Sequence, residues 1–237
     1  MQTLDLDRIC FENTERVLDV GCGEGRLSLH TYSHADVLAV GVDMCLDDLK
    51  TAQSRFDEFD EKSENKQFAL SQTNAYCLPF PDHCFDKVFC SEVLEHLHEY
   101  PKALAEIERV LKPGGVFVAS VPRFWPEKIC WWLSDAYHEV EGGHVRIFKE
   151  QELQKAIEAF GFRRFDKHWA HSLHSPYWWL RCLFWKNQEE NWAVKLYHRF
   201  LVWDLMEKPL LTKILDAVLN PLMGKSVVLY FRKGLQP

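Results

Sequence analysis

The stretch from Arg16 to Gly25, which reads RVLDVGCGEG, constrains the fold more than any other part of the chain. Its first residues are apolar and favour β-structure, as in a strand buried inside a parallel sheet. Glycines then occupy the alternate positions 21, 23 and 25, and Arg26 opens a segment with helical character. A strand, a glycine-rich turn and a helix N-terminus bring backbone N–H groups close to a ligand. The stretch therefore predicts a ligand site at the end of the first strand of an α/β domain.

A carboxylate follows at the spacing expected for a ribose contact. Asp43 ends the next apolar run, VLAVGVD, 18 residues after Gly25. This spacing suits a side chain that binds the two hydroxyls of a ribose. The dinucleotide fingerprint G-x-G-x-x-G needs its third glycine one residue later than Gly25, so an NAD-dependent oxidoreductase is disfavoured.

With Asp19 near the end of the strand, VLDVGCGEG resembles the first motif of class I S-adenosylmethionine-dependent methyltransferases of the small-molecule type. The later segments LPFPDHCFDKVFCSEVLEHL and RVLKPGGVFVASVP resemble the same family in the same order, so the resemblance covers roughly residues 14–165. It implies a Rossmann-like, seven-stranded, mostly parallel sheet with helices on both faces. In this family the last strand lies antiparallel between the fifth and sixth strands.

The resemblance also implies S-adenosyl-L-methionine as the cofactor and assigns residues to it. Residues of the first motif shape the methionine side of the site, and the backbone around positions 90 and 91 faces the same end. Asp43 binds the ribose, and the polar–small pair Asn74-Ala75 lines the adenine. Many relatives carry Asp where this chain has Asn74. The implied cofactor-binding residues are Asp19, Gly21, Cys22, Gly23, Gly25, Asp43, Met44, Asn74, Ala75, Cys90 and Ser91.

The pattern of apolar residues predicts the remaining elements. Residues 1–15 are too few for a substantial lid, and Ser91 starts a helix with Glu92 and Glu95 in its first turn. Further helices are expected over 26–33, 46–59, 100–111 and 149–160, and further strands over 37–43, 68–70, 85–90, 116–121, 162–170 and 226–232.

The chain divides into a methyltransferase core, residues 1–170 and 225–237, and a helical insertion or cap, residues 171–224. A second cap segment, residues 123–147, belongs to the core. The insertion holds five of the nine tryptophans, and its pattern of apolar residues predicts two or three helices. Its aromatic side chains either form the core of an added subdomain, or wall an apolar acceptor pocket, or face a bilayer interface.

Charge and composition exclude some classes of protein. The net charge is −7, and residues 1–170 hold 19 Lys and Arg against 30 Asp and Glu, so a dedicated nucleic-acid binder is disfavoured. The eight scattered cysteines form no C-x-x-C pair, and we expect neither a metal site nor a disulfide framework. The N-terminus lacks the features of a signal peptide and no window holds 18 apolar residues. We expect a cytoplasmic protein, with peripheral membrane contact through residues 171–224 left open.

Methyl transfer from a sulfonium is an in-line displacement, in which the protein mainly holds the donor methyl group and the acceptor together. An oxygen or acidic carbon acceptor benefits from a nearby base, most often His. His144 is the first candidate because it follows the flexible Gly142-Gly143 pair, and His138 and Tyr137 are alternatives. His96 fits better as a helix-face residue, and a mechanism without a protein base stays open.

The sequence therefore predicts a methyltransferase acting on oxygen or carbon of an apolar small-molecule or lipid-like acceptor. One alternative is an RNA (tRNA) modification methyltransferase, although the acidic core provides no basic groove. The segment after the fourth strand reads C-S-E-V rather than the N-P-P-Y of nucleobase amine methyltransferases. The other alternative is a non-catalytic S-adenosylmethionine-binding partner or regulatory protein.

Overall fold

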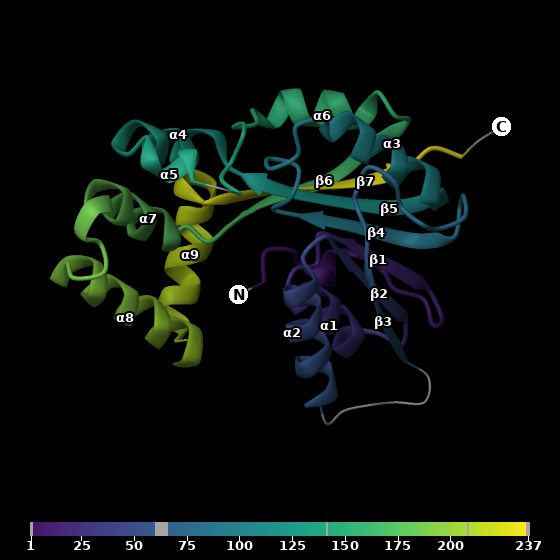
Figure 1. Cartoon of the computed structure of the whole chain (residues 1–237), viewed down its shortest axis with the longest axis horizontal. Coiled ribbons are helices and arrows are strands. Elements are labelled where there is room, and N and C mark those ends of the chain that lie inside the picture. Colours follow the sequence, from purple (N-terminus) through teal and green to yellow (C-terminus); the bar gives the residue numbers. More distant parts are fainter. Residues whose placement is uncertain (1, 60–65, 141, 208, 236–237) are drawn as a thin grey trace.

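The computed structural model of the protein describes residues 2–59, 66–140, 142–207 and 209–235. Within them, seven strands form one sheet in the order β3-β2-β1-β4-β5-β7-β6 (Figure 1). Strands β1 to β5 pair in parallel, and β7 runs antiparallel between β5 and β6, which confirms the predicted fold class. The strands are β1 (Arg16–Val20), β2 (Leu38–Asp43), β3 (Gln67–Gln72), β4 (Phe85–Ser91), β5 (Leu111–Pro122), β6 (Phe162–Ala170) and β7 (Ser226–Lys233).

Helices cover both faces of this sheet: α1 and α2 lie on one face, and α3 and α6 lie on the other (Figure 1). Neighbouring side chains of a strand point to opposite faces. Val17 accordingly packs in the cluster that contains Tyr32, and Leu18 packs in the cluster that contains Leu104. Because both faces are covered, β1 needs a continuous apolar run. These helices are α1 (Arg26–His34), α2 (Leu46–Asp57), α3 (Tyr100–Val110) and α6 (Glu150–Glu158).

The prediction of a helix that starts at Ser91 is wrong. Ser91 ends β4, residues 92–99 form turns, and the helix begins only at Tyr100. Glu92 has a φ angle of 56°, in the left-handed region, so Glu92 cannot belong to the first turn of a right-handed α-helix. Pro101 at the start of α3 favours the later helix start because its missing N–H is not needed there. This loop carries acidic and histidine side chains to the end of the sheet.

A second group of helices lies beyond the carboxyl ends of the parallel strands, the end to which the arrow of β5 points (Figure 1). Residues 171–224 supply three of its α-helices, within the number expected for this segment. The group consists of α4 (Phe124–Leu133), α5 (Ala136–Glu139), α7 (His174–Leu183), the short 3-10 helix η2 (Trp185–Asn187), α8 (Trp192–Glu207) and α9 (Leu210–Met223). The division of the chain at positions 170 and 225 stays a prediction.

The tryptophans of residues 171–224 fall into two environments. Trp179 donates its ring N–H to the Pro126 carbonyl of α4 at 3.0 Å, and the ring of Trp178 lies 5.8 Å from that of Tyr137. Trp192 and Trp203 on α8 are exposed instead. Other large apolar side chains exposed on α8 and α9 are Leu196, Val202, Leu205, Met206, Leu210, Leu211, Ile214, Leu215, Val218 and Leu222. Among the described residues, no helix is both long and apolar enough to cross a membrane.

Candidate active site

The turn after β1 adopts the conformation that its glycines predict. Gly21, Gly23 and Gly25 have φ angles of 72°, 50° and 75°, in the left-handed region where other residues are strained. A Cβ atom on Gly21 would lie 2.3 Å from Cγ2 of Val93 in the β4–α3 loop. Gly21 is therefore required both by the backbone conformation and by the close approach of the neighbouring loop.

Asp43 at the end of β2 holds this turn in place. One carboxylate oxygen accepts from the N–H of Gly23 at 2.8 Å, and the other accepts from the N–H of Cys45 at 2.9 Å. The N–H of Gly21 donates to the Val42 carbonyl at 2.8 Å. The N–H groups of Gly21 and Gly23 are therefore directed to β2. Each Asp43 oxygen keeps a lone pair for a further donor, such as a ribose hydroxyl.

A cavity of about 560 Å³ opens beside Asp43. Met44 and Ala75, both predicted to contact the cofactor, also line it. Asn74, predicted to contact the adenine, is exposed and is not among the lining residues; its side-chain oxygen accepts from the N–H of Tyr76 at 2.9 Å. The neighbouring residue Thr73 lines the cavity.

A second cavity of about 270 Å³ lies on the other side of the glycine turn. Asp19, Cys22 and Ser91, all predicted at the methionine end, line it. Gly21 and Glu92 line both cavities, so the two spaces meet where β1 and β4 end. Cofactor halves on either side of this junction would match the predicted division into a ribose side and a methionine side.

Two other predicted features of the methionine end differ in the structure. Cys90 is completely buried in β4 and lies outside the lining of both cavities. The N-terminal segment, expected to be too short for a lid, contributes residues 2–4 to the wall of the smaller cavity. The hydroxyl of Tyr230 in β7 accepts from the N–H of Asp5 at 3.1 Å and so anchors this segment. Sequence spacing gave no signal for this long-range contact.

Asp19 is the buried acid of the smaller cavity. Burial raises the pKa of Asp19 to about 7, although the Ser28 hydroxyl, which donates to the carboxylate at 2.7 Å, works in the opposite direction. A cation placed in this cavity would stabilise the charged form of Asp19. The α-amino group of an amino acid supplies such a cation.

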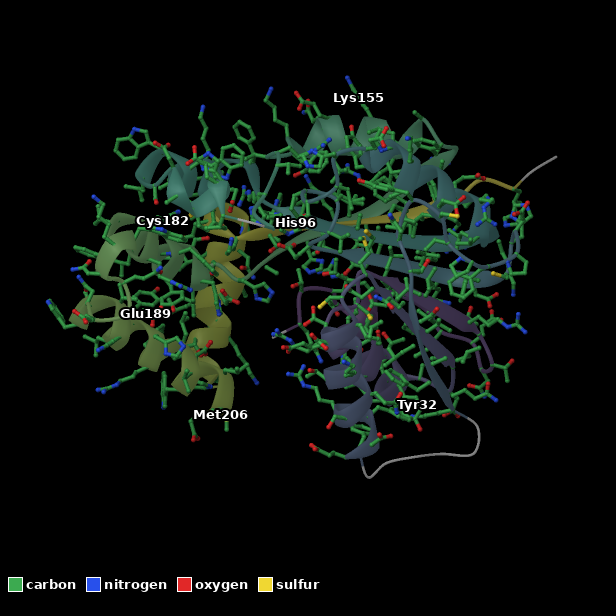
Figure 2. All side chains as sticks on the ribbon, in the orientation of Figure 1. Tyr32, His96, Lys155, Cys182, Glu189 and Met206 are labelled. Carbon is green, nitrogen blue, oxygen red and sulfur yellow. The ribbon has the colours of Figure 1, made fainter. Side chains whose placement is uncertain are left out.

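The β4–α3 loop presents three ionisable side chains near the larger cavity. Glu92 accepts from the hydroxyl of Ser120 at 2.9 Å, and burial raises the pKa of Glu92. His96 lines the cavity, and its label in Figure 2 lies near the carboxyl ends of the central strands. Glu95 is buried, and burial together with the nearby Glu92 raises the pKa of Glu95 well above its usual range.

His144, the first candidate for the base, pairs with a buried carboxylate. Its Nδ1 lies 2.6 Å from Oε1 of Glu127, which is 1% exposed. Glu127 also accepts from Lys225 at 3.4 Å, and His144, Lys225 and Tyr137 together hold the pKa of Glu127 at about 2 despite its burial. The ring of His144 lies 4.9 Å from the ring of His96, so this pair borders the larger cavity through His96.

The two alternative candidates occupy different positions. Tyr137 donates its hydroxyl to Glu127 at 3.3 Å, and burial raises the pKa of Tyr137, which favours a donor over a base at this position. The ring of His138 stacks on that of Trp131 at 4.1 Å, and its buried Nδ1 has no hydrogen-bond partner among the described residues. His144 is therefore the candidate that the structure brings nearest to the larger cavity.

The sequence provided no signal for Glu127 or Lys225 because both lie far along the chain from His144. The sequence predicts a helix-face position for His96 because it predicts a helix where the structure has the β4–α3 loop. Its position beside the cavity follows from the loop conformation alone.

Comparison with known proteins identifies the domain. A family model described as a methyltransferase domain matches residues 18–119. Residues 18–119 are therefore similar to a methyltransferase domain, in agreement with the resemblance to S-adenosylmethionine-dependent methyltransferases. A structure of an S-adenosylmethionine-dependent methyltransferase from Methanosarcina mazei matches with a TM-score of 0.66 at 15% identity, covering 100% of both chains, and so shares the fold.

Relatives with similar sequences match only part of the chain. An O-methyltransferase of Aspergillus nomiae, rstn1, is 34% identical over 108 residues, which cover 46% of this chain and 47% of that protein. A demethylmenaquinone methyltransferase of Symbiobacterium thermophilum is 36% identical over 110 residues, which cover 46% of this chain and 43% of that protein. The match thus spans less than half the length of either relative, and α7 to α9 lie outside the family-model match.

We expect Asp43→Ala to weaken S-adenosylmethionine binding by about 1–3 kcal/mol, the size of a lost hydrogen bond to a charged group. The change also removes the acceptors of the Gly23 and Cys45 N–H groups, so thermal unfolding should be measured beside titration calorimetry. Asp47→Ala is the matched control because Asp47 pairs with Lys50 on the exposed side of α2. Unchanged affinity in the Asp43 variant would contradict the ribose assignment.

The raised pKa of Asp19 predicts a pH-dependent affinity. If the carboxylate binds the cofactor's amino group, protonation of Asp19 competes with binding. Affinity should then fall by up to about tenfold per pH unit below about pH 7, and should fall again at about pH 8, where the α-amino group of the cofactor itself loses its proton. Calorimetry between about pH 5.5 and about pH 8.5 measures this dependence, and Asp19→Asn should flatten the fall below about pH 7 at a weaker affinity. A wild-type affinity that is constant over this range would exclude the amino-group contact.

Proposed function

We propose that the protein transfers the methyl group of S-adenosylmethionine to an oxygen or carbon atom of an apolar small-molecule or lipid-like acceptor. The observation that carries this proposal is the pair of cavities that meet at Gly21 and Glu92. Asp43 stands in one cavity and Asp19 in the other, in the order required by a cofactor with a ribose at one end and an amino acid at the other. The methyltransferase domain supports the same cofactor.

The acceptor class is proposed from the surroundings of His96 and His144. The ring of Tyr137 packs against the rings of His144, Trp178 and Trp185, and such aromatic surfaces favour apolar ligands. The O-methyltransferase among the relatives supports oxygen as the methylated atom. Peripheral membrane contact and a cytoplasmic location stay predictions, the former supported by the exposed apolar residues of α8 and α9.

Incubation with S-adenosylmethionine labelled in its methyl group tests the function. Label should enter an apolar extract, with release of the demethylated cofactor, and should not enter RNA. Gly21→Ala should abolish transfer because its Cβ would overlap Val93, whereas wild-type transfer to RNA alone would favour the RNA methyltransferase. Cofactor binding without any transfer would favour the non-catalytic protein.

We expect His144→Ala to leave S-adenosylmethionine binding unchanged and to lower methyl-transfer turnover by about 10²–10⁴-fold, the usual contribution of a positioned acid–base group. The loss would reflect removal of the side chain that Glu127 orients toward the acceptor end. His138→Ala is the comparison, because His138 stacks on Trp131 and should affect turnover much less. A larger loss in the His138 variant would transfer the role to that residue.

A further inference from the structure

Two segments far apart in the sequence bring three potential metal ligands together. Glu95 and His96 come from the β4–α3 loop, and His144 comes from the segment before α6. One ligand atom from each residue lies within 4.8 Å of the other two. Nε2 of His96 is 4.0 Å from Oε1 of Glu95. No local spacing predicts this cluster, because its members belong to no local motif.

The two imidazole rings are held by contacts that leave one nitrogen of each ring available. Nδ1 of His144 lies 2.6 Å from the Glu127 carboxylate, and Nδ1 of His96 lies 3.2 Å from the carbonyl of Gly143. A histidine that binds a metal through one nitrogen usually donates the other N–H to a carboxylate or a backbone carbonyl. Both rings have this arrangement, with one partner of each kind.

Glu95 supplies a separate observation. Its side chain is 1% exposed, and neither carboxylate oxygen has a hydrogen-bond partner among the described residues. Burial of an unpaired carboxylate is costly, and native proteins almost always satisfy such a group. Oε1 is the oxygen nearest to the His96 ring, so the unsatisfied group belongs to the same cluster. A cation bound here would satisfy Glu95 directly.

We propose that Glu95, His96 and His144 form a binding site for a divalent transition-metal ion. Two imidazoles and one carboxylate are a ligand set typical of Zn²⁺ and of non-haem Fe²⁺. Three protein ligands leave at least one coordination position open. Because His96 lines the larger cavity, the open position would be reached from that cavity.

A role of the bound metal in methyl transfer rests on the proposed function, whereas metal binding itself does not. A hydroxyl group of the acceptor that coordinates the ion would become more acidic and lose its proton to water. The resulting oxygen would form a bond to the methyl carbon while the carbon–sulfur bond breaks. The bonding pair would return to sulfur, which changes from a sulfonium to a neutral thioether. His144 would then assist the reaction as a metal ligand rather than by accepting the acceptor's proton.

Zn²⁺ binding to the full-length protein tests the site. After treatment with a chelator and dialysis, titration calorimetry and elemental analysis should show one Zn²⁺ per chain. Glu95→Gln and His96→Ala should each weaken binding at least tenfold. Glu127→Gln, which changes the group that holds Nδ1 of His144 and leaves the three ligands in place, should weaken it by about 10–100-fold. His98→Ala is the matched control because His98 is an exposed histidine on the same loop. Circular dichroism establishes that each variant is folded.

Absence of Zn²⁺ binding to the wild-type protein, or equal binding by the folded Glu95 and His96 variants, would overturn the inference. Zn²⁺ binding that depends on these residues supports the site even if no methyl transfer is detected. Methyl transfer by a wild-type protein that binds no Zn²⁺ would refute the site and leave the proposed function standing. The two proposals therefore fail separately.

Discussion

The hydrogen bond from the Gly23 N–H to the Asp43 carboxylate fixes the relation between β1 and β2 on which the cofactor end depends. The N–H groups of Gly21 and Cys22 both donate to the Val42 carbonyl, so the turn is tied to β2 at three consecutive positions. Its glycines are needed because the backbone must fold tightly against a neighbouring strand and loop. Asp43 thus has two tasks, since the carboxylate predicted to bind ribose also orders the turn that borders it.

The order of the strands explains why the cavities meet at Gly21 and Glu92. The first strand, β1, lies inside the sheet, with β2 on one side and β4 on the other. Ligands of α/β proteins bind where the connections from such a strand diverge, beyond the carboxyl ends of the strands. Gly21 follows β1 and Glu92 follows β4, its direct neighbour. The segment with α4 and α5 and the helix α7 lie beyond the same ends, so Glu127 and His144 can approach a site built mainly from the first half of the chain.

The predictable part of this structure is the part encoded by local pattern. Apolar runs and glycines located the strands and the turn, and the family resemblance placed β7 between β5 and β6. The β4–α3 loop was missed because its residues have a helical pattern, whereas the backbone at Glu92 takes a left-handed conformation that Ser120 holds. Glu127 could not be found because its role arises only from a contact with His144. Asn74 was placed by the family resemblance; its side-chain oxygen accepts from the N–H of Tyr76, and its contact with the adenine stays a prediction.

Glu92 connects the two ends of the site physically. A non-glycine residue in the left-handed region costs about 1–3 kcal/mol, so surrounding contacts must hold it there. The N–H of Glu92 donates to the Ser120 carbonyl, and the Ser120 hydroxyl donates to the Glu92 carboxylate. Lys225 and His144 both favour the charged form of Glu92, while burial opposes it. The same bend of the backbone that places Glu92 between the two cavities carries Glu95 and His96 toward His144. The conformation of this one residue therefore sets both the junction of the two cofactor cavities and the position of His96 beside His144.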